Sequence, residues 1–228
     1  MVAWDKIDTV LLDMDGTLLD LHFDSYFWLH HLPQRYAEIH NTDPKQTRAE
    51  LVGRITKEHG SLQWYCTDYW SQQLDLDIIA LKREVDHKVA LRPFVMEFLG
   101  QLKNSHRGSL LVTNASRDSV DMKMKKINLL PLFDEVVSSH DYGHAKEQQD
   151  FWQQLHANHP FDPSRTLLID DTESVLTSAD NFGIEHLLTL TQPDSQKALR
   201  ENLLFPSITH FDEIMPSPIL IKRSKPNE

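Results

Sequence analysis

The stretch that decides the fold reads TVLLDMDGTLLD, residues 9–20 of the 228-residue chain. An apolar strand expected at 9–13 leads directly into two carboxylates one residue apart, Asp13 and Asp15. In an extended chain, side chains at positions i and i+2 point to the same side, so both carboxylates can face one small volume. Gly16 follows, which suits a turn where backbone comes close to a ligand. Such a pair either binds a cation or divides nucleophilic and acid/base work.

The composition predicts a globular protein with a substantial core, because 40% of the residues are hydrophobic, including five Trp and ten Phe. The length suits one large domain or two small ones. No run approaches the roughly 18 apolar residues that span a bilayer, and the N-terminus lacks a secretory pattern. We therefore expect a cytoplasmic protein with no membrane partner. The single cysteine, Cys66, excludes an internal disulfide and a cysteine-based zinc cluster.

The charge balance is acidic, with 23 basic and 34 acidic residues and a net charge of −11. A negative field repels nucleic-acid polymers and anionic lipid surfaces, so neither is an expected partner. A small phosphorylated substrate remains compatible if its site carries positive charge. The seven glycines form neither GxGxxG nor GxxxxGK[ST], so dinucleotide binding and P-loop chemistry are unsupported. The oligomeric state is left open between monomer and homodimer.

Short apolar runs that end in polar residues alternate with helical patterns, which is typical of βαβ units and a parallel sheet. The expected strands are 9–13, 109–114, 135–138, 166–170 and 186–190. The expected helices between them are 93–103, 119–128, 148–158 and 174–182. We therefore predict an α/β fold with a Rossmann-like parallel sheet as its core.

Residues 21–90 break this alternation, because they contain only helical patterns. The expected helices are 23–40, 44–59, 62–73 and 77–89. This stretch is too long for a loop. We predict an all-helical domain at 21–90, inserted into an α/β core domain of residues 1–20 and 91–228 and lying over the carboxyl edge of the sheet.

Polar residues gather at the carboxyl ends of the predicted strands or just beyond them, with Lys146 on a loop. Open α/β sheets bind their ligands outside these strand ends. The polar residues are Asp13, Asp15, Thr113, Asn114, Lys146, Asp170 and Asp171. Four converging carboxylates with only Lys146 to offset them would repel one another and raise each other's pKa. A divalent cation would relieve this repulsion. Oxygen donors without His or Cys favour Mg²⁺, so charge balance alone predicts a magnesium site.

The order of these motifs resembles the haloacid dehalogenase-like (HAD) superfamily of phosphohydrolases. The resemblance rests on Asp13-x-Asp15-Gly16-Thr17, a strand-ending Thr113, Lys146, and an acidic pair 24 to 25 residues later. The helical stretch is similar in position to the superfamily's C1-type cap domain. This resemblance implies the HAD fold, Mg²⁺ as cofactor, and hydrolysis of phosphate monoesters through an aspartyl-phosphate.

The resemblance also implies a role for each matching residue. Asp13 would be the nucleophile and a metal ligand. Asp15 would act as general acid and then as base, and its backbone carbonyl would bind the metal. Thr113 and Asn114 would bind the phosphoryl oxygens. Lys146 would serve both catalysis and phosphate binding by neutralising negative charge.

The acidic pair supplies the remaining metal ligand. Counted back from Gly183, Asp171 occupies the superfamily's usual ligand position, so it is assigned to the metal. Asp170 replaces a frequent glycine and is either an outer supporting group or an alternative ligand. The dehalogenases of the superfamily lack an acid two positions after the nucleophile. The presence of Asp15 therefore favours phosphoryl transfer, with phosphatase preferred over mutase.

Within the superfamily, several segments resemble the bacterial GMP/IMP nucleotidases. They are residues 9–21, Phe23-Asp24-x-Tyr26-Phe27-Trp28, Trp64-Tyr65-Cys66-x-Asp68-Tyr69-Trp70 and Ile169-Asp170-Asp171. This resemblance implies a purine 5′-nucleotide as substrate. The alternatives are a phosphatase for sugar phosphates or phosphoglycolate, a receiver-like switch, and a non-catalytic HAD-fold binding protein.

The aromatic residues of the helical stretch are expected mostly in its core. Pairs four residues apart, Phe23 with Phe27 and Tyr65 with Tyr69, would each share a helix face. Aromatic rings also stack on nucleobases, and the candidates for such stacking are Tyr26, Trp28 and Trp64. Cys66 is expected to be buried and inert.

Overall fold

The computed structural model describes residues 2–105 and 107–216. Its centre is a parallel sheet with the strand order β3-β2-β1-β4-β5-β6. The strands are β1 Thr9–Leu12, β2 Gly108–Thr113, β3 Glu135–Ser138, β4 Thr166–Ile169, β5 His186–Leu190 and β6 Ser207–Ile208. The predicted α/β fold and five of its strands are thus confirmed. The sixth, β6, has only two residues and was not expected.

Strand β1 lies in the middle of the sheet, paired with β2 on one side and β4 on the other. Its residues Val10, Leu11 and Leu12 are fully buried, which explains a continuous apolar run rather than an alternating one. The chain leaves β1 toward β2 and β3, and later returns to the other side of β1 as β4. The carboxyl ends of these neighbouring strands therefore open at a topological switch point, where ligands bind in such sheets.

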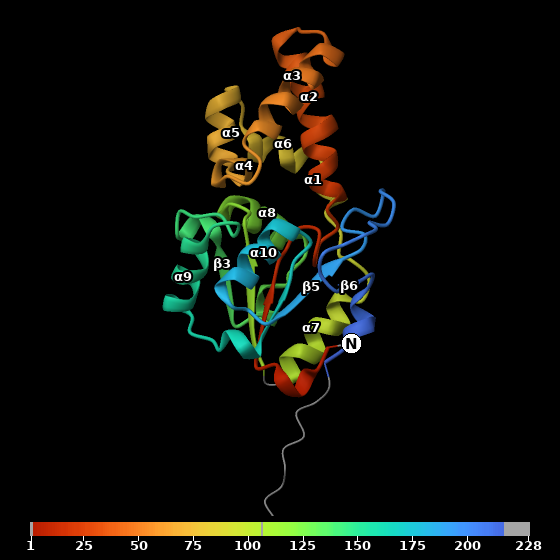
Figure 1. Cartoon of the computed structure of the whole chain (residues 1–228). Helices are drawn as coiled ribbons and strands as arrows, with labels where there is room; N and C mark the ends of the chain where they lie inside the picture. Colours follow the sequence, from red (N-terminus) through yellow and green to blue (C-terminus); the bar gives the residue numbers. More distant parts are fainter. Residues whose placement is uncertain (1, 106, 217–228) are drawn as a thin grey trace, which may run out of the picture.

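Four helices cover the two faces of the sheet (Figure 1). Helices α7 Val95–Asn104 and α8 Arg117–Lys126 share a core with one face, on which Val10 and Leu12 lie. Helices α9 Gln149–Asn158 and α10 Glu173–Phe182 share a second core with the opposite face, on which Leu11 lies. The alternation of Val10, Leu11 and Leu12 between two cores follows from the period of two in a strand.

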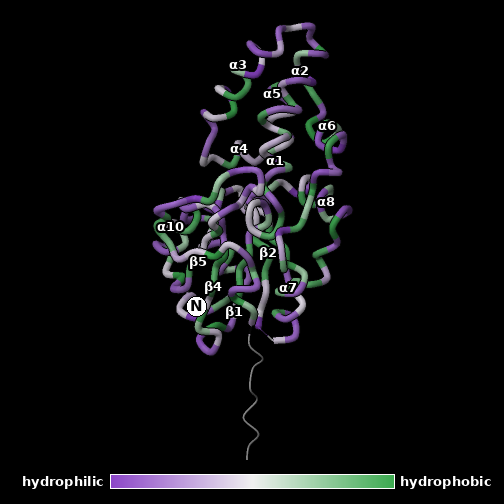
Figure 2. The backbone as a smooth tube through the Cα atoms, turned by 90° about the vertical axis from the view of Figure 1, so that its right-hand side faces the viewer, coloured by the Kyte–Doolittle hydropathy of each residue, from purple (hydrophilic) through white to green (hydrophobic). Residues whose placement is uncertain are grey.

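The other α-helices form a helical segment, residues 22–88, which lies over the carboxyl edge of the sheet (Figure 1). Its elements are α1 His22–Tyr26, a π-helical turn Phe27–His31, α2 Leu32–His40, α3 Pro44–Lys57, α4 Leu62–Tyr65, α5 Thr67–Leu74, α6 Ile78–Glu84 and a 3-10 turn Asp86–Lys88. It has a hydrophobic core of its own, to which α8 adds Met122. Hydrophobic and hydrophilic stretches alternate along its helices (Figure 2), as expected for helices with one buried face.

The segment joins the sheet through two chain crossings that lie side by side. The amide of Asp20 donates to the carbonyl of Ala90 at 2.9 Å, and that of Arg92 donates to the carbonyl of Leu18 at 3.0 Å. Leu19 and Leu91 form an antiparallel bridge between these bonds. The crossings lie close to the predicted boundaries at 20/21 and 90/91, although the division into two domains remains a prediction.

Three expectations about residues 62–73 are wrong. The predicted helix 62–73 is two helices, because Cys66 adopts an extended backbone between α4 and α5. Tyr65 and Tyr69 therefore lie on different helices and do not share a face. Cys66 is half-buried rather than buried, and its Sγ accepts a hydrogen bond from the Tyr69 amide at 3.3 Å as the N-cap of α5.

The predicted helix 23–40 is continuous but contains the π-helical turn. Pro33 follows this turn in the first positions of α2 and has no amide proton to donate to the preceding turn, which explains the local irregularity. Within the residues that the structure describes, no helix is both long and apolar enough to cross a membrane.

Candidate active site

Asp13 and Asp15 lie where the chain leaves β1 and turns. The Asp13 amide still donates to the Ile169 carbonyl at 3.0 Å, so this residue continues the sheet by one position. Met14 between them is fully buried in the core, whereas both aspartates line the cavity above the sheet. The expectation that the two carboxylates face one volume is therefore supported by the geometry.

Gly16 shapes this turn because no larger residue fits there. Its φ is +89°, and a Cβ built on it would lie 2.6 Å from Cγ of Asp171. The missing side chain thus lets the loop after β1 approach the acidic pair after β4. This close approach brings Asp13 and Asp171 into one site.

Lys146 lies at the centre of the site and is buried. Its Nζ donates to Oδ1 of Asp13 at 2.6 Å, to Oδ2 of Asp170 at 2.7 Å and to the Val112 carbonyl at 3.0 Å. Burial alone would lower the pKa of Lys146, but the two carboxylates outweigh it and raise that pKa above its ordinary value. Lys146 is therefore an ammonium ion bridging the ends of β1 and β4.

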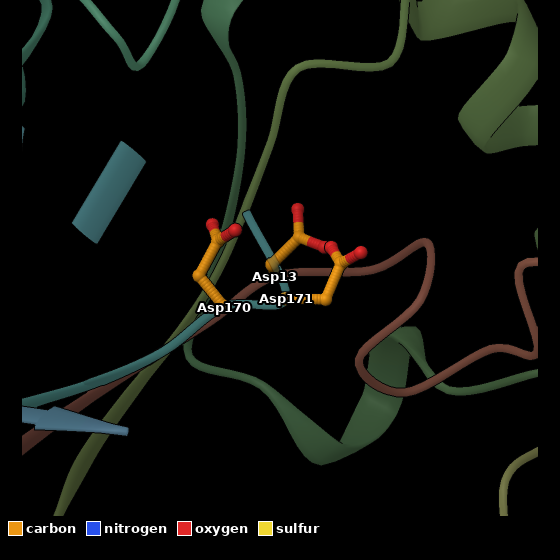
Figure 3. A group of neighbouring side chains, drawn as sticks. All are labelled: Asp13, Asp170 and Asp171. Carbon is orange, nitrogen blue, oxygen red and sulfur yellow. The ribbon is translucent and has the colours of Figure 1, made fainter. Parts of the chain in front are cut away.

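Three carboxylates form an acidic cluster. One oxygen from each of Asp13, Asp170 and Asp171 lies within 4.8 Å of the others, and Figure 3 shows the three side chains together at the strand ends. Burial raises the pKa of Asp13 to about 6, against the opposing effect of Lys146. Burial, together with Asp13 and Asp170, raises the pKa of Asp171 well above its usual range.

The donor set fits a hard divalent cation, because every side-chain donor is a carboxylate oxygen. Asp170 already accepts from Lys146 and from the Thr172 amide at 2.9 Å. Among the residues that the structure describes, no cationic side chain pairs with the Asp171 carboxylate. Asp171 is thus the freer ligand of the two, which supports the expected assignment without testing it.

Thr113 and Asn114 lie at the end of β2, beside Lys146, and both line the cavity. Oγ1 of Thr113 accepts from the Ala115 amide at 3.1 Å. Oδ1 of Asn114 accepts from the Lys146 amide at 2.9 Å, and its Nδ2 donates to Glu147 at 3.0 Å. These bonds fix both side chains at the place where the sequence predicts phosphate binding.

Sequence reasoning missed two lysines, and the account with Lys146 as the only offsetting charge is wrong. Lys123 on α8 lies 2.7 Å from Asp15 and 2.7 Å from Asp24 of α1. Lys82 on α6 lies 2.8 Å from Asp24. Burial alone would raise the pKa of Asp24, but the two lysines hold it well below its usual range.

A cavity of about 370 Å³ lies between the acidic cluster and the helical segment. Its walls include the apolar side chains Trp28, Leu29, Val52, Ile55 and Trp64. The stacking candidate Tyr26 is not among the lining residues. Its ring packs instead on His30, at a centroid distance of 5.8 Å, and under the ammonium of Lys88 at 4.2 Å.

Residues 10–189, which contain this whole constellation, match the family model of the haloacid dehalogenase-like hydrolases. The chain belongs to that family. The resemblance drawn from the motifs is therefore confirmed, and this hydrolase is a phosphatase-type enzyme, as its sequence predicted.

The hydrolase is similar to proteins with known names. It is 38% identical over 216 residues to the GMP/IMP nucleotidase YrfG of Escherichia coli (strain K12), which covers 95% of this chain and 97% of the relative. It is 26% identical over 186 residues to the pyrophosphatase PpaX of Bacillus mycoides (strain KBAB4), covering 78% and 81%. The crystal structure of a HAD phosphatase from Thermococcus onnurineus shares the fold, with a TM-score of 0.75, 19% identity and coverage of 91% and 95%.

Proposed function

We infer that this hydrolase is a Mg²⁺-dependent phosphate monoester hydrolase that acts through an aspartyl-phosphate on purine 5′-nucleotides such as GMP and IMP. One observation carries the proposal: the cavity combines a floor of carboxylates and lysines with a wall of aromatic side chains. The floor suits a phosphate and the wall suits a nucleobase. The similarity to a protein named GMP/IMP nucleotidase over nearly the whole chain supports the same substrate class.

The metal would be held by the carboxylates of Asp13 and Asp171 and by the backbone carbonyl of Asp15, with Asp170 as support or alternative ligand. Magnesium, when bound, would supply positive charge to the phosphoryl oxygens and relieve the repulsion within the acidic cluster. The chain's own residues account for the other steps.

Asp13 would attack phosphorus. Its carboxylate sits on the cavity floor, and Lys146 fixes one oxygen at 2.6 Å, leaving the other for bond formation. As the new bond from Asp13 to phosphorus forms, the bond from phosphorus to the leaving oxygen breaks, and its electron pair stays with that oxygen. Lys146, Thr113 and Asn114 would hold the phosphoryl oxygens in line for this step.

Asp15 would donate its proton to the leaving oxygen and become a carboxylate. It would then take a proton from the water that attacks the aspartyl-phosphate, which restores Asp13 and releases phosphate. General acid/base work of this kind contributes roughly 10²–10⁴ in rate. The helical segment above the site would exclude bulk water during these steps.

A panel of phosphate esters tests the proposed substrate class. GMP and IMP are expected to turn over with higher kcat/KM than phosphoglycolate, small sugar phosphates and pyrophosphate. If a small phosphosugar or phosphoglycolate is preferred, the nucleotide assignment is wrong. The same panel assayed with Asp13→Asn should show no turnover, and activity equal to the parent protein would reject the mechanism and support a non-catalytic reading of the site.

The chain offers a matched control for the aromatic wall, because Trp64 lines the cavity and Tyr26 does not. Trp64→Ala should raise KM for GMP by about tenfold, because aromatic stacking on a base contributes about 1–3 kcal/mol. The same change should leave p-nitrophenyl phosphate nearly unaffected. Tyr26→Ala removes an aromatic ring outside the cavity and should leave KM for GMP unchanged. If both substitutions change KM for GMP equally, the aromatic wall does not bind the nucleobase.

A further inference from the structure

Lys123 is a buried lysine for which the mechanism above gives no role. It belongs to α8, a helix that packs on the sheet, yet its side chain is turned into the site and is only 1% exposed. A lysine is rarely buried unless it is paired. The neighbouring residues Met122 and Met124 show that this part of α8 readily holds apolar side chains.

The partners of Lys123 connect two parts of the molecule. Its Nζ lies 2.7 Å from Oδ2 of Asp15, which comes from the loop after β1, and 2.7 Å from Oδ2 of Asp24, which comes from the helical segment. The other oxygen of Asp24 accepts from Lys82 at 2.8 Å. Two carboxylates and two ammonium ions thus alternate in one row, Asp15–Lys123–Asp24–Lys82.

Lys123 is also the group that fixes the Asp15 carboxylate. Among the residues that the structure describes, no other cationic side chain lies within ion-pair distance of Asp15. The Asp13 carboxylate, in contrast, is held by Lys146. The two candidate catalytic carboxylates therefore have separate lysines, one from the loop before α9 and one from α8.

Stability alone is a weak reason for such a row. Replacing a buried ion pair with well-packed apolar residues is often neutral or stabilising, because charges lose solvation when they are buried. The row does supply orientation, since Lys123 is itself held by Asp24, and Asp24 by Lys82. This chain of ion pairs keeps the Asp15 carboxylate at one position beside the cavity.

We propose that Lys123 is the positioning residue for Asp15, and that Asp24 and Lys82 of the helical segment hold Lys123 in place for this purpose. The proposal rests on the proposed function, in which Asp15 protonates the leaving oxygen. In this role Lys123 would act through Asp15 and not directly on the phosphorus or the leaving oxygen. It sets where the Asp15 proton is delivered, and it faces the negative charge left on Asp15 after that proton has gone.

Leaving-group dependence separates positioning of an acid from a structural role. A p-nitrophenolate departs without needing a proton, whereas phenolate and the 5′-oxygen of a nucleotide depend on one. Lys123→Met removes the ammonium and keeps a long side chain between two existing methionines. In the whole chain with Mg²⁺, it should lower kcat/KM for phenyl phosphate, which reports the step that releases the leaving group, by about 10²-fold, as expected for a misplaced catalytic group. It should lower kcat/KM for p-nitrophenyl phosphate by less than about tenfold, since that ester needs little of the 10²–10⁴-fold help from acid catalysis.

Matched variants complete the test. Asp15→Asn should show the same split between the two esters, and adding Lys123→Met to it should not widen the split. Lys82→Met removes the outer ammonium of the row and so loosens Lys123. It should show a split between the two esters in the same direction as Lys123→Met, but a smaller one; an equal loss on both esters would remove Lys82 from the positioning role. Lys123→Arg keeps the positive charge, and hence the buried ion pairs, but shifts the position of the N–H donors. This variant replaces Lys123→Met in the test if Lys123→Met does not fold. A smaller split in the same direction is expected from it.

The outcomes distinguish this proposal from the proposed function. An equal loss on both aryl esters in Lys123→Met, or in Lys123→Arg where only that variant folds, would overturn the positioning role. A wild-type protein that hydrolyses both aryl esters but not GMP would refute the nucleotide assignment and leave the Lys123 test readable. A wild-type protein that hydrolyses no ester would overturn both.

Discussion

Replacing Gly16 with alanine tests the geometry of the site without touching any charged group. The added Cβ would lie 2.6 Å from Cγ of Asp171 and 2.6 Å from its Oδ2. Ordinary contacts between non-bonded atoms are about 3.5 Å or longer, so the loop or the carboxylate must move by about 1 Å. A displacement of this size in a reacting group costs about 10²-fold in rate.

The backbone adds a second cost. At φ +89°, a residue with a Cβ loses roughly 1–3 kcal/mol of stability relative to glycine. Gly183 provides a matched control, because its φ is +107° and nothing lies within 4 Å of the position of its Cβ. Gly183→Ala should therefore lose a comparable amount of stability and keep its activity. The comparison separates backbone strain from the collision with Asp171.

Two measurements test whether the contact between the Gly16 loop and Asp171 organises the site. Urea unfolding in EDTA gives the stability of each variant, and p-nitrophenyl phosphate hydrolysis over a Mg²⁺ titration gives activity and metal requirement. Gly16→Ala should lose about 10²-fold in kcat/KM and need more Mg²⁺ for half-maximal activity. If its activity and Mg²⁺ requirement match those of Gly183→Ala, then contact between this loop and Asp171 does not organise the site.

Three further predictions concern charge in the site. Excess EDTA should abolish phosphatase activity and Mg²⁺ should restore it, since the proposed mechanism requires a cation at the acidic cluster. Activity unchanged by the chelator would contradict the proposed metal dependence. Lys146→Met should lower the free energy of unfolding in urea by roughly 3–5 kcal/mol, because it leaves Asp13 and Asp170 buried without their ammonium. Lys126→Met removes a half-exposed ion pair and should lower it by under about 1 kcal/mol. Equal losses in the two variants would refute the reasoning. Without metal, the pKa values of Asp13 and Asp15 are raised from 3.8 to about 6. Between pH 3.8 and about pH 6, the folded metal-free protein therefore binds more protons than the unfolded chain, and its stability falls as the pH rises through this range. Mg²⁺ must compete with those protons, so it should raise the melting temperature more at pH 7.5 than at pH 5, and an equal rise at both would reject the assignment.

The strand-end chemistry was predictable because it depends on local pattern. The apolar runs of three neighbouring strands end in the polar residues Asp13, Thr113 and Asp170. Parallel strands place these ends at one edge of the sheet, so the three residues could be brought together without coordinates. The π-helical turn and the break at Cys66 were not predicted. Pro33 was a local signal for the first, because it has no amide proton to donate to the preceding turn. The helical pattern continues through the second, so the sequence pattern does not indicate it.

Lys123 was missed for a different reason. A lysine on a helix that also carries Lys125 and Lys126 is ordinarily a solvated side chain. A signal was nevertheless present, because Lys123 follows Val120 by three positions and precedes Ile127 by four, which places it on an apolar helix face. What that face meets depends on the helical segment, whose position over α8 the sequence pattern does not specify.

The side-by-side crossings at Leu18–Asp20 and Ala90–Arg92 have a consequence for how such proteins diversify. Since the chain leaves and re-enters the sheet at hydrogen-bonded neighbours, 69 intervening residues could be exchanged for another insert, or for a tight turn, without altering the path of any strand. Grafting a foreign insert here would retain Asp13, Lys146 and Asp171 but discard Asp24 and Lys82. On the proposed mechanism, an exchange of inserts would alter the choice of substrate. It would also alter the reaction rate, because Lys123 would lose the Asp24 and Lys82 that hold it. The backbone of this junction thus tolerates a different insert, whereas the side chains of the sheet domain and of the insert depend on each other.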